Sequence, residues 1–170
     1  VTIDAGGMIG SAQLKAEAQV RDLFANGEIV AEDANITASA SLENFDLNGL
    51  QPFLGDEVPP GFLEGAAGGP VNLDVKIDRK DSITTVDAKV AAQELNGTAG
   101  LKMTEKVIDV KAFQLKYMIS PGMVDLVLME MKETARLVSP VSVVMSSSNL
   151  SYDLEAEEGA PLEDRIGGGM

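Results

Sequence analysis

The residue types that usually perform enzyme chemistry are scarce in this sequence. The chain has no cysteine and no histidine, which excludes Ser-His-Asp and Cys-His nucleophile systems, disulfides, and ordinary zinc or haem sites. Catalysis would need paired carboxylates or a Ser–Lys arrangement, and no local spacing singles one out. Glu130 and Glu133 lie near an expected helix end, where they more simply face solvent. We therefore expect that the protein is not an enzyme, has no catalytic residues and binds no cofactor.

Acidic side chains are the remaining candidates for holding a metal ion, because Ca²⁺ prefers oxygen ligands. The densest acidic set is Asp153, Glu155, Glu157 and Glu158. It lacks the Asp-x-Asp-x-Asp-Gly spacing of a dedicated calcium loop. We therefore expect no metal site, and interpret residues 155–170 as an acidic, glycine-rich tail.

Length and charge restrict the class of protein further. The 170 residues fit one domain, or one slice of a longer repetitive protein. With 45% hydrophobic and 24% charged residues, the chain has the composition of a folded protein. Its 13 basic and 27 acidic residues give a net charge of −14, which argues against binding nucleic acid. No stretch approaches the roughly 20 continuous apolar residues of a membrane-spanning helix.

The elements that position these side chains are mainly strands, because apolar residues recur at every second position. The clearest run places Val71, Leu73, Val75 and Ile77 on one face and polar residues on the other. A second run places Val86, Ala88 and Val90 on one face. Residues 79–82 between the two runs suit a turn, so the pair is predicted to form a hairpin.

Further alternating runs cover residues 12–20, 36–42, 101–103, 107–115, 134–145 and 149–154, with a turn at 26–27 and a short strand at 29–31. The run at 12–20 is rich in helix-forming residues, but a helix would scatter its apolar positions around the circumference. Within 107–115 the apolar phase switches between Val110 and Phe113, which a β-bulge would resolve. Pro140 argues for an edge strand or a kink.

Two segments depart from the alternating pattern. Residues 55–69 are rich in glycine and proline and are interpreted as a loop-rich connector. Ser120 and Pro121 begin a helix predicted over residues 121–131, whose apolar stripe would pack on the sheet. We thus expect a single β-rich domain over residues 1–154, with one helix too small to cover all of its strands.

Three passages of the chain resemble bacterial AsmA-like and TamB-like proteins. Residues 41–55 (SLENFDLNGLQPFLG) resemble the phrase with which a strand of that family ends before a short helical corner. Residues 68–78 (GGPVNLDVKID) are similar to the family's glycine followed by a long alternating strand. The passage from Ile119 to Val143 resembles its helix-then-strand blocks. The resemblance covers residues 11–154, although the repeats here are irregular in length and neither the family's N-terminal membrane anchor nor its C-terminal signature is present.

This resemblance implies a curved antiparallel sheet, a β-groove or β-taco segment, whose apolar concave face conducts lipids. It implies the bacterial periplasm or cell envelope, anchoring to the inner membrane through a segment outside this sequence, and possible envelope protein partners. The expected partner is a phospholipid or other acyl-chain lipid, in phospholipid transport or outer-membrane maintenance. The residues expected to face lipid are Val71, Leu73, Val75, Ile77, Val86, Ala88 and Val90.

The apolar alternation also fits a different protein class. A structural or adhesive β-sandwich of an extracellular or cell-surface protein would bury the same residues between two sheets. The two alternatives differ in one observable: a groove leaves a large contiguous apolar surface open, whereas a sandwich hides it.

Overall fold

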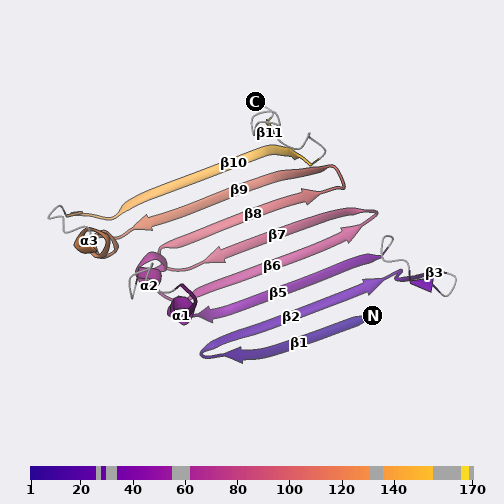
Figure 1. The fold of residues 1–170 in the computed structure, drawn as a ribbon, viewed down its shortest axis with the longest axis horizontal. Coiled ribbons are helices and arrows are strands. Elements are labelled where there is room, and N and C mark those ends of the chain that lie inside the picture. Colours follow the sequence, from indigo (N-terminus) through magenta and orange to yellow (C-terminus); the bar gives the residue numbers. More distant parts are fainter. Residues whose placement is uncertain (26–27, 30–33, 55–61, 131–135, 155–165, 169–170) are drawn as a thin grey trace.

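One antiparallel sheet dominates the computed structural model, which describes residues 1–25, 28–29, 34–54, 62–130, 136–154 and 166–168. Its strand order is β1-β2-β5-β6-β7-β8-β9-β10-β11, so the strands of this sheet lie side by side in the order in which the chain reaches them (Figure 1). The strands are β1 (Thr2–Ile9), β2 (Ala12–Arg21), β5 (Asn35–Phe45), β6 (Val71–Lys80), β7 (Ile83–Ala91), β8 (Leu95–Met103), β9 (Val107–Ile119), β10 (Val141–Asp153) and β11 (Ile166–Gly168). A separate small sheet pairs β3 (Phe24–Ala25) with β4 (Glu28–Ile29). The predicted mainly β, curved antiparallel architecture is confirmed.

The hairpin of β6 and β7 forms where the alternation is strongest. Val75 pairs with Ala88, and the same register holds along both strands. Asp81 and Ser82 form the two-residue connection with φ of 50° and 61°. Positive φ at both central residues gives a turn whose twist matches that of the strands it joins.

The phase switch in β9 is resolved by the predicted bulge. Leu101 of β8 pairs with Val110, while the preceding Gly100 pairs with Ala112, which leaves Lys111 as an extra residue. On the other side of β9, Asn149 of β10 is also unpaired and has a φ of 56°. The extra residue brings the apolar side chains before and after it onto one face of the sheet.

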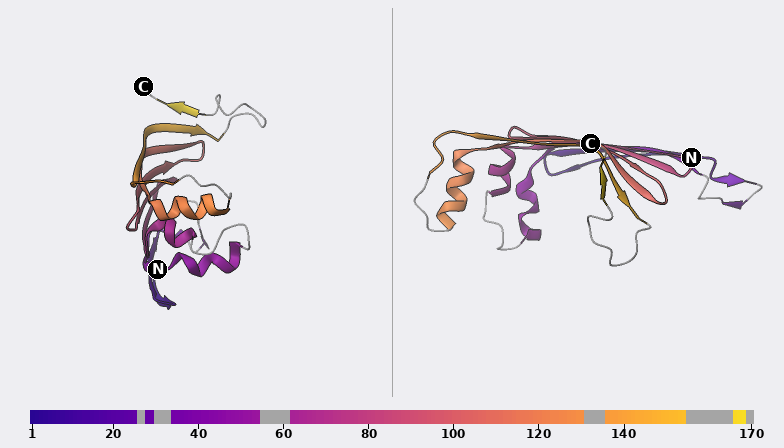
Figure 2. Two further views of the ribbon diagram at one scale, coloured as in Figure 1. Left: turned by 90° about the vertical axis from the view of Figure 1, so that its left-hand side faces the viewer. Right: turned by 90° about the horizontal axis from the view of Figure 1, so that it is seen from above.

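The helices that the structure describes lie at one end of the sheet. Between β5 and β6 the chain forms a 3-10 helix η1 (Leu47–Leu50), α1 (Gln51–Leu54) and α2 (Phe62–Ala67); between β9 and β10 it forms α3 (Pro121–Glu130). The predicted helix near 121–131 is therefore confirmed. Both connections join strand ends at the same end of the sheet, and Figure 2 shows the helices on the same side of it.

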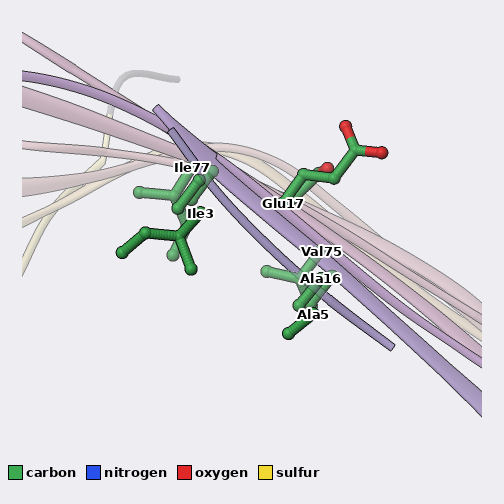
Figure 3. A pocket seen from close by; sticks show the side chains of 10 residues that line it. Ile3, Ala5, Ala16, Glu17, Val75 and Ile77 are labelled. Carbon is green, nitrogen blue, oxygen red and sulfur yellow. The ribbon is translucent and has the colours of Figure 1, made fainter. Parts of the chain in front are cut away.

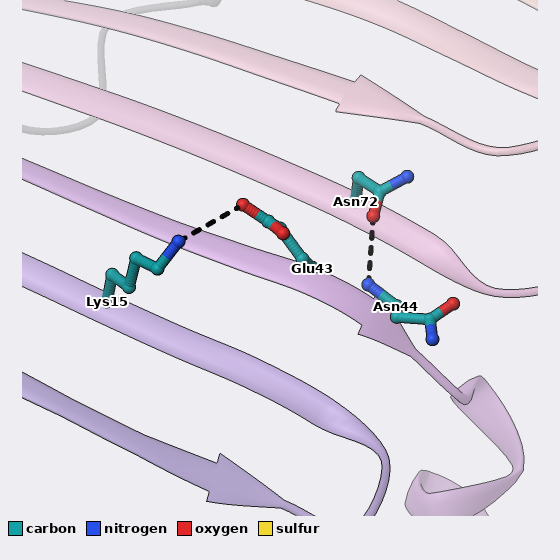
Figure 4. Close-up of polar contacts among 4 residues, drawn as sticks. All are labelled: Lys15, Glu43, Asn44 and Asn72. Carbon is teal, nitrogen blue, oxygen red and sulfur yellow. Dashed lines mark hydrogen bonds and ion pairs between the residues drawn. The ribbon is translucent and has the colours of Figure 1, made fainter.

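The corner after β5 is built by local polar contacts. The β5–β6 register shifts between Leu42 and Phe45, where the N–H of Asn44 donates to Oδ1 of Asn72 at 2.8 Å (Figure 4). The Asp46 side chain then caps η1 by accepting from the N–H of Asn48 at 2.9 Å. Nearby, Lys15 Nζ lies 3.8 Å from Glu43 Oε1 across β2 and β5. The contacts of Asn44 and Asp46 thus lie where β5 ends and the helical corner begins.

Four details differ from the sequence prediction. Within the connector predicted as loop over 55–69, residues 62–67 form α2, which contacts η1 and α3 and whose last carbonyl, that of Ala67, accepts from the N–H of Glu94 at 2.9 Å; residues 55–61 lie outside the described part. The strands predicted before and after Ser146 are one strand, β10, which begins directly after Pro140. Strand β1 was not predicted, since Gly6 and Gly7 weaken its pattern. Finally, α3 stands at the end of the sheet instead of packing across the strands (Figure 2).

Several further sequence predictions fall on residues that the structure does not describe. They are the turn at 26–27, most of the short strand at 29–31, the start of the run at 134–145, and the acidic tail from residue 155 to 165.

The described residues form almost no closed core. Only Ala12, Ala34, Ala67 and Val71 are buried, and no large side chain among the described residues is fully buried. Most apolar side chains of the sheet therefore gain only part of the roughly 1.5–3 kcal/mol that complete burial of such a side chain provides.

Candidate functional site

The apolar residues of eight strands share one surface, which we call the apolar face. The register places Ala16 opposite Ala5 and Ala40, Ala40 opposite Val75, Val75 opposite Ala88, and Ala88 opposite Ala99. Ala99 in turn lies opposite Phe113. The apolar face consists of Ile3, Ala5, Ile9, Ala12, Leu14, Ala16, Ala18, Val20, Ile36, Ala38, Ala40, Leu42, Val71, Leu73, Val75, Ile77, Val86, Ala88, Val90, Leu95, Ala99, Leu101, Met103, Ile108, Val110, Phe113, Leu115, Tyr117, Ile119, Val141, Val143, Met145, Leu150 and Tyr152.

The seven residues expected to face lipid lie together at the centre of this face. Leu73 pairs with Val90, Val75 with Ala88, and Ile77 with Val86. Val71 continues the row on β6 toward the helical end, where it is buried, with 8% of its surface exposed. The structure thus brings all seven side chains to one contiguous patch on β6 and β7.

The apolar face is open to solvent. Leu73 is 39% exposed and Ile77 is 37% exposed although both lie in the middle of the sheet, and Ile3 on β1 is 59% exposed. No second sheet covers this face in the described part of the chain, since the only other sheet is the two-residue pair β3–β4. An exposed apolar surface that extends over eight strands is unusual for a monomer and indicates a binding surface.

The apolar face is also the concave one. The hydroxyl of Tyr117, a residue of the apolar face, donates to Sδ of Met123 in α3 at 2.6 Å, so α3 lies on the apolar side. Figure 2 shows that both outer edges of the sheet turn toward the side that carries the helices. Burial, and secondarily the negative charge of Glu94, raise the pKa of Tyr117 above its usual value of 10.0. The phenol therefore keeps its proton, and with it the contact to α3.

A shallow hollow lies in the apolar face where small side chains meet. Ala16 and Ala18 on β2 lie beside Ala38 and Ala40 on β5, and together they leave a space of about 210 Å³. Larger side chains border it: Ile3 on one side, Val75 and Ile77 on the other. Figure 3 shows these border residues on one side of the sheet and Glu17 pointing to the opposite side. We call this hollow the alanine trough.

The alanine trough was missed by sequence reasoning, which placed the lipid-facing residues on β6 and β7 alone. The signal was present, because both alternating runs at 12–20 and 36–42 place alanine at successive inward positions. The sequence does not show the register between β2 and β5. In the structure, Ala16 pairs with Ala40 and Ala18 with Ala38, and this register brings the small side chains together.

The opposite face is polar and charged. Its cross-strand neighbours have opposite charges, as in Lys76 opposite Asp87 and Asp74 opposite Lys89. A hollow of about 740 Å³ lies over these residues and Gly100, which has no side chain to fill it. Complementary neighbours of this kind stabilise a solvated sheet surface. The arrangement has the chemistry of an outer surface that faces water.

Metal-binding and membrane-spanning features are absent from the described residues. They contain no group of three or more acidic side chains that could hold a metal ion. Of the acidic set considered for calcium, only Asp153 is described, at the end of β10, and Glu133 also lies outside the described part. No described helix is both long and apolar enough to cross a membrane.

Comparisons with family models, curated proteins and solved structures found no match to this chain.

Proposed function

We propose that this chain is a non-enzymatic segment that shields lipid acyl chains on its apolar face. Acyl chains would lie along the concave side, over the patch on β6 and β7 and in the alanine trough, with headgroups toward water. The observation that carries the proposal is the open apolar face, central residues of which, Leu73 and Ile77, stay more than one-third exposed.

The energetics of the apolar face favour an acyl chain as its ligand. Burying about eight methylene groups at about 0.8 kcal/mol each recovers roughly 6 kcal/mol, which is the order of the entropic cost of association. A linear chain can obtain this burial from a long shallow surface, whereas a compact small molecule requires an enclosed pocket. The alanine trough supplies extra depth where a methylene chain would lie closest to the backbone.

The resemblance to AsmA-like and TamB-like proteins supports the biological setting. It implies a segment of the bacterial periplasm or cell envelope that acts in phospholipid transport or outer-membrane maintenance, with anchoring outside this sequence. The helical corner of η1 and α1 after β5 accords with the corner that the resemblance implies. Shielding is passive, so it requires a continuous apolar path and breaks no bond.

Photo-crosslinking tests the proposed function directly. A zwitterionic phospholipid with a diazirine in the middle of one acyl chain is mixed with the protein, irradiated, and the labelled residues are identified by peptide mass spectrometry. We expect adducts on apolar-face residues of β2, β5, β6 and β7. Adducts distributed equally over both faces, or confined to chain segments outside the sheet, would contradict the proposal. A protein that takes no label, with the apolar face protected from solvent labelling, would favour the β-sandwich alternative.

A further inference from the structure

The outer side of β1 offers an unused row of backbone hydrogen-bonding groups. The Val1 amino group donates to the carbonyl oxygen of Val20 at 2.7 Å, and the carbonyl oxygen of Val1 accepts from the N–H of Val20 at 2.8 Å. Along an antiparallel strand, the backbone groups of successive residues point alternately to the two neighbouring strands. The N–H and C=O groups of the odd-numbered residues of β1 therefore point toward β2. Thr2, Asp4, Gly6 and Met8 therefore direct their N–H and C=O groups outward, where no strand of the described chain pairs with them.

The outer side of β10 offers a row of the same length. The N–H of Met118 donates to the carbonyl oxygen of Glu94 at 2.7 Å. The backbone N–H and C=O groups of the even-numbered residues of β9 near Met118 therefore point toward β8. The backbone groups of the odd-numbered residues of β9 then bond to β10, where their partners include Val143, Met145 and Ser147. The outward groups of β10 over residues 141–148 belong to Ser142, Val144, Ser146 and Ser148. Strand β11 covers only the later residues 150–152.

Within the described residues, these stretches of β1 and β10 have no lysine, no proline and no covering strand. Natural sheet edges are blocked by lysine, proline, bulges or covering segments. Strand β1 has a single charged residue, Asp4, and no proline, and residues 141–148 have neither charge nor proline. The irregularity at Asn149 lies just beyond the open stretch of β10. Both edges are therefore suited to strand addition.

The two edges are complementary in three respects when one copy is translated beside another. The eight long strands alternate in direction, so β10 of one copy runs antiparallel to β1 of the next (Figure 1). Translation keeps both apolar faces on the same side. The outward-bonding residues of both strands have their side chains on the polar face, so their ladders are in phase. With Gly6 opposite Val144, Ala5 meets Met145 on the apolar face.

We propose that copies of this chain associate head to tail, with β1 of one copy pairing with residues 141–148 of β10 in the next. The occupant of each edge is thus a second copy of the chain. The association extends the apolar face from copy to copy and sets all helices along one side of the assembly. It depends on the sheet edges alone, so it holds or fails separately from the lipid proposal.

Proline substitutions at outward-bonding positions test the pairing. Gly6→Pro and Ser146→Pro each remove an outward N–H and leave the bonds within the chain intact; Gly6→Ala and Ser146→Ala are the controls that keep the N–H. Sedimentation velocity is measured over a concentration series. We expect wild type and the alanine variants to form dimers and larger species. Each proline variant alone is expected to stay monomeric, with dimerisation weakened at least tenfold.

Mixing the two proline variants distinguishes head-to-tail pairing from other contacts. The β10 edge is unchanged in Gly6→Pro, and the β1 edge is unchanged in Ser146→Pro. One copy of each can therefore pair through these two edges, so the 1:1 mixture is expected to form dimers and nothing larger. Self-association of Ser146→Pro alone would indicate a two-fold β1 pair and overturn the proposal. Self-association of both variants, or a monomeric wild type at millimolar concentration, would overturn it as well. Circular dichroism verifies folding, and Asp4→Pro with Val144→Pro replaces any variant that does not fold.

Discussion

Consecutive residues of β6 serve opposite surfaces of the sheet. Val75 lies on the apolar face between Ala40 and Ala88, whereas Lys76 lies on the polar face opposite Asp87. Because the apolar face is open, a polar substitution there should affect ligand binding more than folding. Single residues therefore test whether this face serves as a binding surface or as a core.

We predict that Val75→Asp folds but loses lipid. The new carboxylate reaches solvent from the open face, so the free energy of unfolding falls by about 1–2 kcal/mol, less than for an unpaired charge in a closed core. Lipid retention falls at least tenfold, because the charge would be desolvated under an acyl chain. Thr98→Asp adds the same charge on the polar face and should retain lipid. Urea unfolding and lipid extraction measure both effects; failure of Val75→Asp alone to fold would indicate a covered face.

Among the glycines compared in the described part of the chain, Gly68 would bring an added Cβ closest to a neighbouring atom. Its φ is +74°, and a Cβ there would lie 2.5 Å from Cγ of Glu94. We predict that Gly68→Ala destabilises the protein by about 1–3 kcal/mol, since backbone strain and the clash add. Gly7→Ala is the control, because a Cβ at Gly7 meets no atom within 4 Å. Thermal unfolding compares the two; equal melting temperatures would disprove the tight packing of this connection against Glu94.

At the scale of elements, the helical end depends on a titratable contact. The Tyr117 hydroxyl donates to Sδ of Met123, and the pKa of Tyr117 is raised by burial and by the charge of Glu94. The folded protein therefore holds this proton more tightly than the unfolded chain. The stabilisation is complete below pH 10 and is lost as the pH rises through the raised pKa.

We predict that α3 loosens at alkaline pH. Ionised Tyr117 cannot donate to Met123, so the methyl NMR signal of Met123 should shift above pH 10 while signals from β6 and β7 stay unchanged. Tyr117→Phe should abolish this pH dependence and increase amide hydrogen exchange in α3 at neutral pH. A Met123 signal that titrates identically in Tyr117→Phe would assign the effect to another group.

The elements show how far sequence reasoning reaches. Strands β2, β5, β6 and β7 follow from alternation, and the bulge in β9 follows from the phase switch after Val110. The alternation does not predict strand β1, because its two glycines contribute no side chain to the pattern. The residue pattern does not predict α1 and α2, because four and six residues are too few to establish a helical period. Only the family resemblance implied a helical corner where α1 lies. The alanine trough could not be predicted from the sequence, because it depends on the β2–β5 register, which is set by tertiary pairing.

At the scale of the whole molecule, alternation could not decide between an open and a closed sheet. A sandwich and a groove both require apolar residues at every second position, and they differ only in what covers them. The structure leaves the apolar face uncovered over the described residues and curves it toward the helices. Apart from the family resemblance, the main indication of an open sheet in the sequence was that the one predicted helix is too small to cover all of the strands.

The net charge predicts a headgroup preference. With a net charge of −14, the protein repels anionic membrane surfaces at low ionic strength. We predict faster lipid extraction from phosphatidylcholine vesicles than from vesicles containing phosphatidylglycerol, with the difference shrinking several-fold from low to physiological and high salt. A fluorescence assay with labelled acyl chains measures both rates. Faster extraction from the anionic vesicles would show that local basic residues dominate over the net charge.

Native mass spectrometry of the purified protein, followed by extraction and identification of bound lipid, tests the central claim most directly. The account predicts stoichiometric phospholipid in the wild-type protein and in Thr98→Asp, and its loss from folded Val75→Asp. A folded wild-type protein that carries no lipid and takes none from vesicles would contradict it.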